Sequence, residues 1–285
     1  TRRSSDLPLI GHADWNDCLN LNCFSTEPNE SFQTAGDVEG SVAESVMIAG
    51  LFLVAARDMA SLYRSLDRAE DASRIDQSYG AMLDAIETHA WDGDWYIRAF
   101  DAHGHPVGSR RCEEGKIYIE SQAWCVLGGA GRDNGRARKA IESVERELQT
   151  PNGIILQQPP YSAYHVELGE VSSYPPGFKE NGGIFSHNNT WIHLGWCLLG
   201  EGERALRAYL SICPSAKQDQ IDVYRSEPYV YAQMTAGPDS PAPGEAKNSW
   251  LTGTATWSFV VAAPGIPGTV RRGPNPHSLI PQRYG

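Results

Sequence analysis

The densest group of chemistry-bearing residues in the chain is Ala13-Asp14-Trp15-Asn16-Asp17-Cys18-Leu19-Asn20. These eight residues include two carboxylates, an indole and two amides. An indole can stack on the apolar face of a sugar ring, and amides and carboxylates can bind its hydroxyls. A protonated carboxyl can donate a proton to a departing glycosidic oxygen. Asp and Asn are also common in capped turns that do no chemistry. The cluster therefore allows two interpretations, a sugar site or a capped turn.

Length, composition and charge narrow the class of partner. The chain has 285 residues with 41% hydrophobic content, which is enough to bury a large core. Its formal charge of −11 is spread without a basic block, so we expect neither nucleic acid nor an anionic membrane as a partner. No apolar run approaches the roughly 18 residues of a membrane span, and the first residues contain no signal-peptide segment. These features favour a neutral small molecule as ligand and the cytoplasm as location.

Cysteine and histidine spacing points away from disulfides and metals. The six cysteines are widely spaced and include no CxxC pair, which is typical of reduced core residues in a reducing compartment. The eight histidines form no HExxH or comparable pattern. We therefore expect no structural metal.

Helical periodicity accounts for most of the remaining chain. Apolar residues recur every three or four positions over 42–66 and again over 68–91, which predicts two long helices joined as a hairpin. Residues 95–100 alternate weakly and favour a short strand or extended loop. The same reasoning predicts further helices at 119–128, 135–148, 187–199, 201–213 and 250–261.

Two long loops, 157–186 and 224–249, are polar, aromatic and rich in Gly and Pro. Long loops between helices tend to carry functional sites. Helical hairpins separated by such loops favour an α/α toroid, in which inner helices line a barrel and the loops at one end build a cleft. Periodicity by itself predicts only a mostly α protein.

Two of the later segments offer ligand-binding groups. Gly182-Gly183 would let the backbone approach a ligand, with charged groups beside it, although a glycine pair can equally be the entry turn of an amphipathic helix. Thr252-Gly253, at a predicted helix start, presents a hydroxyl and backbone N–H groups that suit an anion. A lone histidine such as His187 is more often a core or surface residue than a ligand.

Taken together, the motifs ADWND, PPGFKENGGIFSH, YRSEPYVYAQM and GEAKNSWLTGTATW resemble the C-terminal half of the catalytic domain of glycoside hydrolase family 94, over about residues 7–261. That family includes phosphorylases of cellobiose, cellodextrins, chitobiose, laminaribiose and cellobionic acid. Within it, ADWNDCLNLNCFS is most similar to the cellobiose phosphorylases.

The resemblance implies a partial (α/α)6 barrel with long loops and a few short strands. It also implies reversible, inverting phosphorolysis of cellobiose by inorganic phosphate, which gives α-glucose 1-phosphate and glucose. Such an enzyme is a glycosyltransferase-type phosphorylase that needs no organic cofactor, since phosphate is itself a substrate. The complete enzyme is expected to be a homodimer.

The resemblance also implies roles for individual residues. Asp17 matches the general acid, and its pKa would have to be raised by burial or by negative charge such as that of the incoming phosphate. Asp14 is interpreted as structural or as a hydroxyl ligand, and Asn16 as a turn-former. The other matched positions are Trp15 and Glu180 at the donor sugar, Glu170, Tyr174 and Lys179 around the acceptor, and His187, Thr252 and Gly253 at phosphate.

The match has limits at both ends. The family places a β-sandwich, the first barrel helices and a phosphate-binding arginine upstream, so we expect residues 1–261 to be the C-terminal part of the barrel and inactive alone. Residues 262–285 form a Pro/Gly/Arg-rich tail, either a disordered terminus or the product of a shifted reading frame. Two alternative functions stay open, an inverting hydrolase with Asp17 as acid and Glu180 as base, and a noncatalytic sugar-binding or structural fragment.

Overall fold

Helices dominate the computed structural model, which describes residues 5–28 and 42–265. The helices are α1 Val46–Ser65, α2 Ala69–Ala85, α3 Ile119–Gly128, α4 Arg136–Glu147, α5 Ser186–Leu198, α6 Gly202–Ile212, α7 Ile221–Tyr224 and α8 Thr254–Val260. The strands are β1 Glu44–Ser45, β2 Ala99–Phe100, β3 Pro106–Val107, β4 Ile117–Tyr118, β5 Gln149–Thr150, β6 Gly153–Ile154, β7 Gln157–Gln158, β8 Ile184–Phe185, β9 Ala232–Thr235 and β10 Ala246–Ser249. The mostly α prediction is confirmed.

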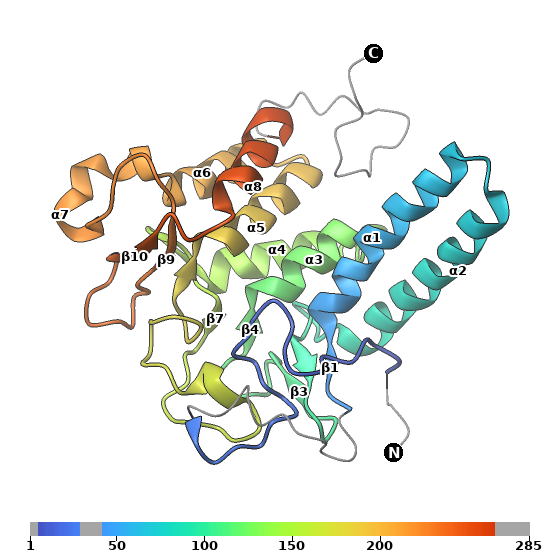
Figure 1. Ribbon diagram of the computed structural model, residues 1–285, viewed down its shortest axis with the longest axis horizontal. Coiled ribbons are helices and arrows are strands. Elements are labelled where there is room, and N and C mark those ends of the chain that lie inside the picture. The colour runs from blue at the N-terminus through green and yellow to red at the C-terminus, as the bar shows by residue number, and fades with distance from the viewer. Residues whose placement is uncertain (1–4, 29–41, 266–285) are drawn as a thin grey trace.

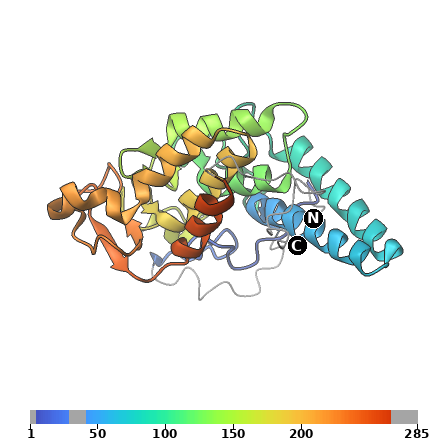
Figure 2. The ribbon, with the colours of Figure 1, turned by 90° about the horizontal axis from the view of Figure 1, so that it is seen from above.

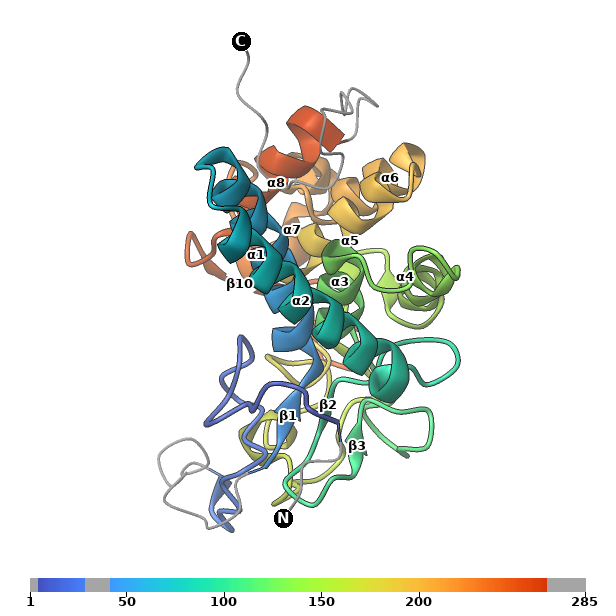
Figure 3. The same cartoon turned by 90° about the vertical axis from the view of Figure 1, so that its right-hand side faces the viewer.

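The helices are arranged as an inner and an outer layer. α1, α3, α5 and α8 contact one another in chain order, while α2, α4 and α6 each pack against the inner helix that precedes them (Figures 1 and 3). The α1–α2 hairpin lies at one end of the molecule and α7 at the other (Figure 2). The ring is open, so the described residues form part of an α/α toroid, as expected.

Burial separates the two layers. All ten residues of α3 are buried, and so are ten of the thirteen in α5, whereas α2 buries only Ala72. The helix predicted at 187–199 is therefore present as α5, but it is buried on nearly all sides and is not amphipathic. α5 contacts α3, α4, α6 and α8, so it has almost no solvent-facing side along which polar residues would gather.

The crossing of α1 and α3 depends on glycine. A Cβ at Gly50 would lie 2.6 Å from the backbone nitrogen of Cys125, and one at Gly128 would lie 2.8 Å from Leu53 Cβ. The two inner helices therefore approach more closely than side chains would allow. This close approach sets the spacing of the inner wall.

Short sheets occupy the loop end of the helices. They are ordered β1-β2-β3, β10-β9-β8, β4-β7 and β5-β6, and all pairs are antiparallel. Both predicted long loops are thus partly strand. The helix expected at 250–261 begins only at Thr254, because Asn248 and Trp250 have left-handed backbone conformations that end β10 in a turn.

One expectation about apolar runs is wrong. By length and mean hydropathy, α1 is apolar enough to cross a membrane, although this test is also passed by core helices of soluble proteins. In the structure α1 packs on α2 and α3. Most of the tail prediction, residues 266–285, lies outside the described residues.

Candidate active site

The loop of residues 13–20 is shaped by hydrogen bonds from its own side chains. Asp14 Oδ1 accepts from the Asn16 N–H at 3.0 Å, and Asn16 Oδ1 accepts from the Cys18 N–H at 3.1 Å. Asn16 and Cys18 are buried, whereas Asp17 between them is exposed. The capped turn is therefore real, and it leaves the Asp17 carboxyl accessible to a ligand.

Asn20 joins this loop to a segment far along the chain. Its N–H donates to the Leu168 carbonyl at 2.9 Å, and its side-chain NH2 donates to the Asp17 carbonyl at 2.9 Å. Its side-chain oxygen accepts from the Glu170 N–H at 3.2 Å. One buried amide thus fixes Asp17 and Glu170 relative to each other.

The three predicted acceptor residues lie together around Tyr174, whose hydroxyl is near Cys18. The Tyr174 hydroxyl donates to Glu170 Oε1 at 2.6 Å and lies 3.7 Å from Cys18 Sγ. The Lys179 ammonium lies 5.6 Å from the centroid of the Tyr174 ring. Hydroxyl, carboxylate and ammonium groups thus share one surface, which is the mixture of donors and acceptors that sugar hydroxyls require.

Electrostatics place Glu180 and Asp17 at the same cluster. Burial raises the pKa of Glu180, Lys179 opposes the rise, and Glu170 adds to it. Burial also raises the pKa of the Cys18 thiol. The negative charges of Glu180, Glu170 and Asp17 are further causes of that rise. The charges of three carboxyls from two distant loops therefore act on one thiol.

The Trp15 side chain packs against aromatic rings of β8 and α5. The Trp15 ring centroid lies 5.4 Å from that of Trp191, 5.8 Å from Phe185 and 6.1 Å from His187, all edge to face. Trp15 is half-buried, so part of its ring is accessible. Burial lowers the pKa of His187, so at neutral pH this imidazole is uncharged and offers one N–H donor.

The start of α8 lies against His187. A Cβ at Gly253 would lie 3.3 Å from His187 Cε1, and Gly253 is the N-terminal cap of α8. The Thr252 and Thr254 hydroxyls are hydrogen bonded at 2.6 Å. The predicted phosphate residues are therefore neighbours, and the expectation of a helix start at Thr252-Gly253 is confirmed.

A three-stranded sheet brings these distant segments together. β8 runs directly into α5 and pairs with β9, which pairs with β10 ahead of α8. The turn before β8 is tight, because a Cβ at Gly183 would lie 2.3 Å from the Lys179 carbonyl oxygen. The sheet and this turn set both the acceptor cluster and the α8 start relative to α5.

Sequence reasoning missed a buried ion pair under the loop. Arg98 Nη1 and Nη2 donate to the two carboxylate oxygens of Asp14 at 2.7 and 2.6 Å, and Arg98 Nε lies 3.8 Å from Glu120 Oε2. This supports the structural interpretation of Asp14 over the hydroxyl-ligand one. In the sequence, the feature that could have indicated this ion pair is a single arginine within the apolar run Trp95-Tyr96-Ile97-Arg98-Ala99-Phe100.

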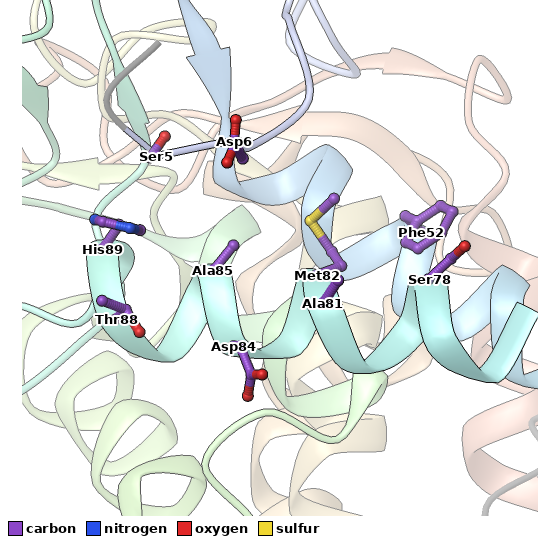
Figure 4. A pocket seen from close by; sticks show the side chains of 10 residues that line it. All are labelled: Ser5, Asp6, Phe52, Ser78, Ala81, Met82, Asp84, Ala85, Thr88 and His89. Carbon is purple, nitrogen blue, oxygen red and sulfur yellow. The ribbon is translucent and has the colours of Figure 1, made fainter.

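A hollow of about 500 Å³ lies elsewhere, along α1 and α2 (Figure 4). Its wall includes Phe52, Met82 and His89 and contains none of the predicted site residues. Within residues 5–28 and 42–265, no group of three or more His, Cys, Asp or Glu side chains is arranged to hold a metal ion.

The fold and the site define a class, an α/α-toroid domain whose loop end gathers carboxyls and aromatic rings as sugar-binding sites do. The chain belongs to the glycosyl hydrolase 94 superfamily, because the model of that superfamily's catalytic domain matches residues 3–268. A solved structure of GH63 mannosylglycerate hydrolase from Thermus thermophilus has a similar fold, with a TM-score of 0.50 and 15% identity over 82% of this chain and 48% of that one.

Named relatives are similar across most of the chain. N,N'-diacetylchitobiose phosphorylase of Vibrio furnissii is 36% identical over 92% of the chain, and solabiose phosphorylase of Paenibacillus borealis is 33% identical over 89%. The chain spans only 30% and 31% of their lengths. The family expectation is confirmed, and these relatives are named for two different disaccharides.

Proposed function

We propose that this chain is part of the catalytic domain of an inverting phosphorylase that cleaves a β-linked disaccharide with inorganic phosphate. The convergence of Asp17, Glu170, Tyr174 and Glu180 around Cys18 carries the proposal. Membership of the superfamily and two relatives named as phosphorylases support it.

In this proposal Asp17 protonates the glycosidic oxygen as the bond to the anomeric carbon breaks. A phosphate oxygen attacks that carbon from the opposite face, which inverts its configuration. Trp15 stacks on the donor sugar. Phosphate is already a nucleophile at neutral pH, so no second carboxyl has to activate water.

Phosphate binding is assigned to His187, Thr252 and Gly253. The neutral His187 donates a hydrogen bond, and the Thr252 hydroxyl can turn from Thr254 to a phosphate oxygen. On the other side, Glu170, Tyr174 and Lys179 bind the acceptor sugar and Glu180 the donor. Hydrogen bonds to an anion in a partly desolvated site aim it as well as hold it.

We propose cellobiose as the disaccharide, with α-glucose 1-phosphate and glucose as products. The sequence ADWNDCLNLNCFS supports this choice. No organic cofactor enters the scheme.

The test is to incubate the full-length protein with phosphate and, separately, cellobiose, cellobionic acid or N,N'-diacetylchitobiose, and to identify products by phosphorus and proton NMR. We expect α-glucose 1-phosphate from cellobiose. The β anomer would contradict inversion, and phosphate-independent glucose release would favour the hydrolase with Asp17 as acid and Glu180 as base. No turnover of any of the three disaccharides would favour a noncatalytic role.

A further inference from the structure

Three buried charged groups lie beneath the loop that carries Asp17. The side chains of Asp14, Arg98 and Glu120 are at most 1% exposed. One guanidinium therefore faces two carboxyl groups where water does not reach. Buried charges are costly unless they are paired, so the position of each depends on the others.

The proton affinities of the two carboxyls differ. Burial raises the pKa of Glu120 to about 7, with Asp14 adding to the rise and Arg98 opposing it. Burial would also raise the pKa of Asp14, but Arg98 and hydrogen bonds from Ser45 and Asn16 lower it. Near neutral pH the ion pair is thus Asp14 with Arg98, and Glu120 is the carboxyl that holds a proton more readily.

The three residues tie the loop to the ends of the inner helices. Arg98 directly precedes β2, and Glu120 lies in the first turn of α3. Ser45 Oγ caps α1 by accepting from the Ile48 N–H at 3.1 Å, and the same hydroxyl donates to Asp14 Oδ2 at 2.7 Å. The Asp14 carboxylate is therefore held by Ser45 at the start of α1 and by Arg98 next to β2. Glu120 of α3 lies near the same arginine.

From Asp14 the connection to the proton donor is short. The Asp14 side chain accepts a hydrogen bond from the Asn16 N–H, and the Asn16 side chain accepts one from the Cys18 N–H. Both chain neighbours of Asp17 are therefore fixed by these hydrogen bonds. A displacement of the Asp14 carboxylate would move the turn and the Asp17 carboxyl with it.

We propose that this buried charge clamp, made of Asp14, Arg98 and Glu120, consists of positioning residues that aim the proton donor at the glycosidic oxygen. The inference rests on the function proposed above. It requires that loss of the clamp impair proton donation more than it impairs sugar or phosphate binding.

The test compares two donors in the full-length protein, cellobiose and β-glucosyl fluoride. In both reactions a phosphate oxygen bonds to the anomeric carbon, but fluoride departs with the bonding pair and needs far less protonation than a sugar oxygen. We expect Arg98→Lys to lower kcat for cellobiose about tenfold or more relative to kcat for the fluoride, with KM for phosphate changed by less than about threefold.

The matched control is Arg136→Lys. Arg136 pairs with Glu87 at 2.6 Å and joins α4 to the segment that follows α2, away from the loop. We expect its ratio of the two kcat values to stay within about twofold of wild type. Glu120→Gln keeps a carbonyl oxygen near Arg98 Nε, where Glu120 Oε2 lies at 3.8 Å, and should keep the ratio within about threefold of wild type.

Equal losses with both donors in Arg98→Lys would overturn the clamp as a positioning device. If that variant does not fold, the same ratio is read on Asp14→Asn. An inactive wild type would refute the proposed function instead. The clamp is then tested by hydrogen exchange of the amides of residues 15–19, where exchange in Arg98→Lys no faster than in Arg136→Lys would overturn it.

Discussion

Asn20 and Gly169 lie so close that a Cβ at Gly169 would come within 2.6 Å of Asn20 Cβ. Gly169 has a φ of +76°, in the left-handed region. This contact allows the Asn20 side chain to hold Asp17 and Glu170 together. Two segments that supply different parts of the proposed site therefore meet through one glycine.

Gly169→Ala should destabilise the protein by roughly 1–3 kcal/mol and raise KM for the acceptor sugar. Gly135→Ala is the control, because Gly135 has a φ of +79° with nothing near its missing Cβ. Both variants carry backbone strain, but only the first displaces Asn20. Thermal melting and kinetics with glucose in the synthetic direction measure the difference, and equal KM values for the two variants would contradict the role of the contact.

Asp17→Asn should lower kcat for cellobiose by about 10²- to 10⁴-fold while the protein still folds, since the side chain is exposed. β-Glucosyl fluoride should be turned over much closer to the wild-type rate. The control is Glu167→Gln, an exposed carboxyl beyond the predicted site. Near-normal activity of Asp17→Asn on cellobiose would remove Asp17 as the proton donor.

His187→Ala, which removes the ring N–H donor, should raise KM for phosphate about 10- to 150-fold and leave KM for cellobiose within about twofold, because a lost hydrogen bond to an anion costs about 1.5–3 kcal/mol. Burial lowers the pKa of His187 below its ordinary value of 6.5, so the imidazole is mostly uncharged above pH 7. We therefore expect no loss of phosphate affinity from its titration between pH 7 and 8. His105→Ala, at an exposed histidine, is the control.

Glu120 should make stability depend on pH. Its pKa in the folded protein is about 7, against 4.5 ordinarily, so between these values the folded protein holds a proton that the unfolded chain has released. The free energy of unfolding should fall by about 3 kcal/mol as pH rises from 4.5 to 7 and then level off. Asp14, Arg98 and Tyr118 are the charged or titratable groups that interact with this carboxyl.

Glu120→Gln should remove this decrease in the free energy of unfolding between pH 4.5 and 7. Glu113→Gln, at an exposed position, should keep it. Urea unfolding at several pH values gives the comparison. An unchanged slope in Glu120→Gln would show that other groups cause the dependence.

The amino-acid sequence determined the helices and the family. The periodicity of 119–128 predicted α3 to the residue, because a long regular pattern of apolar side chains reflects local helical geometry. Four motifs together identified the superfamily, and one of them drew attention to Asp17.

How those parts fit together became visible in the folded chain. Periodicity describes one element at a time, so it did not show that α5 is enclosed by four other helices. It also does not separate a buried charge from a surface one, which is why Arg98 and Glu120 were missed. Their roles come from partners distant in the chain, and such pairings are set by packing and desolvation of the folded chain rather than by local pattern.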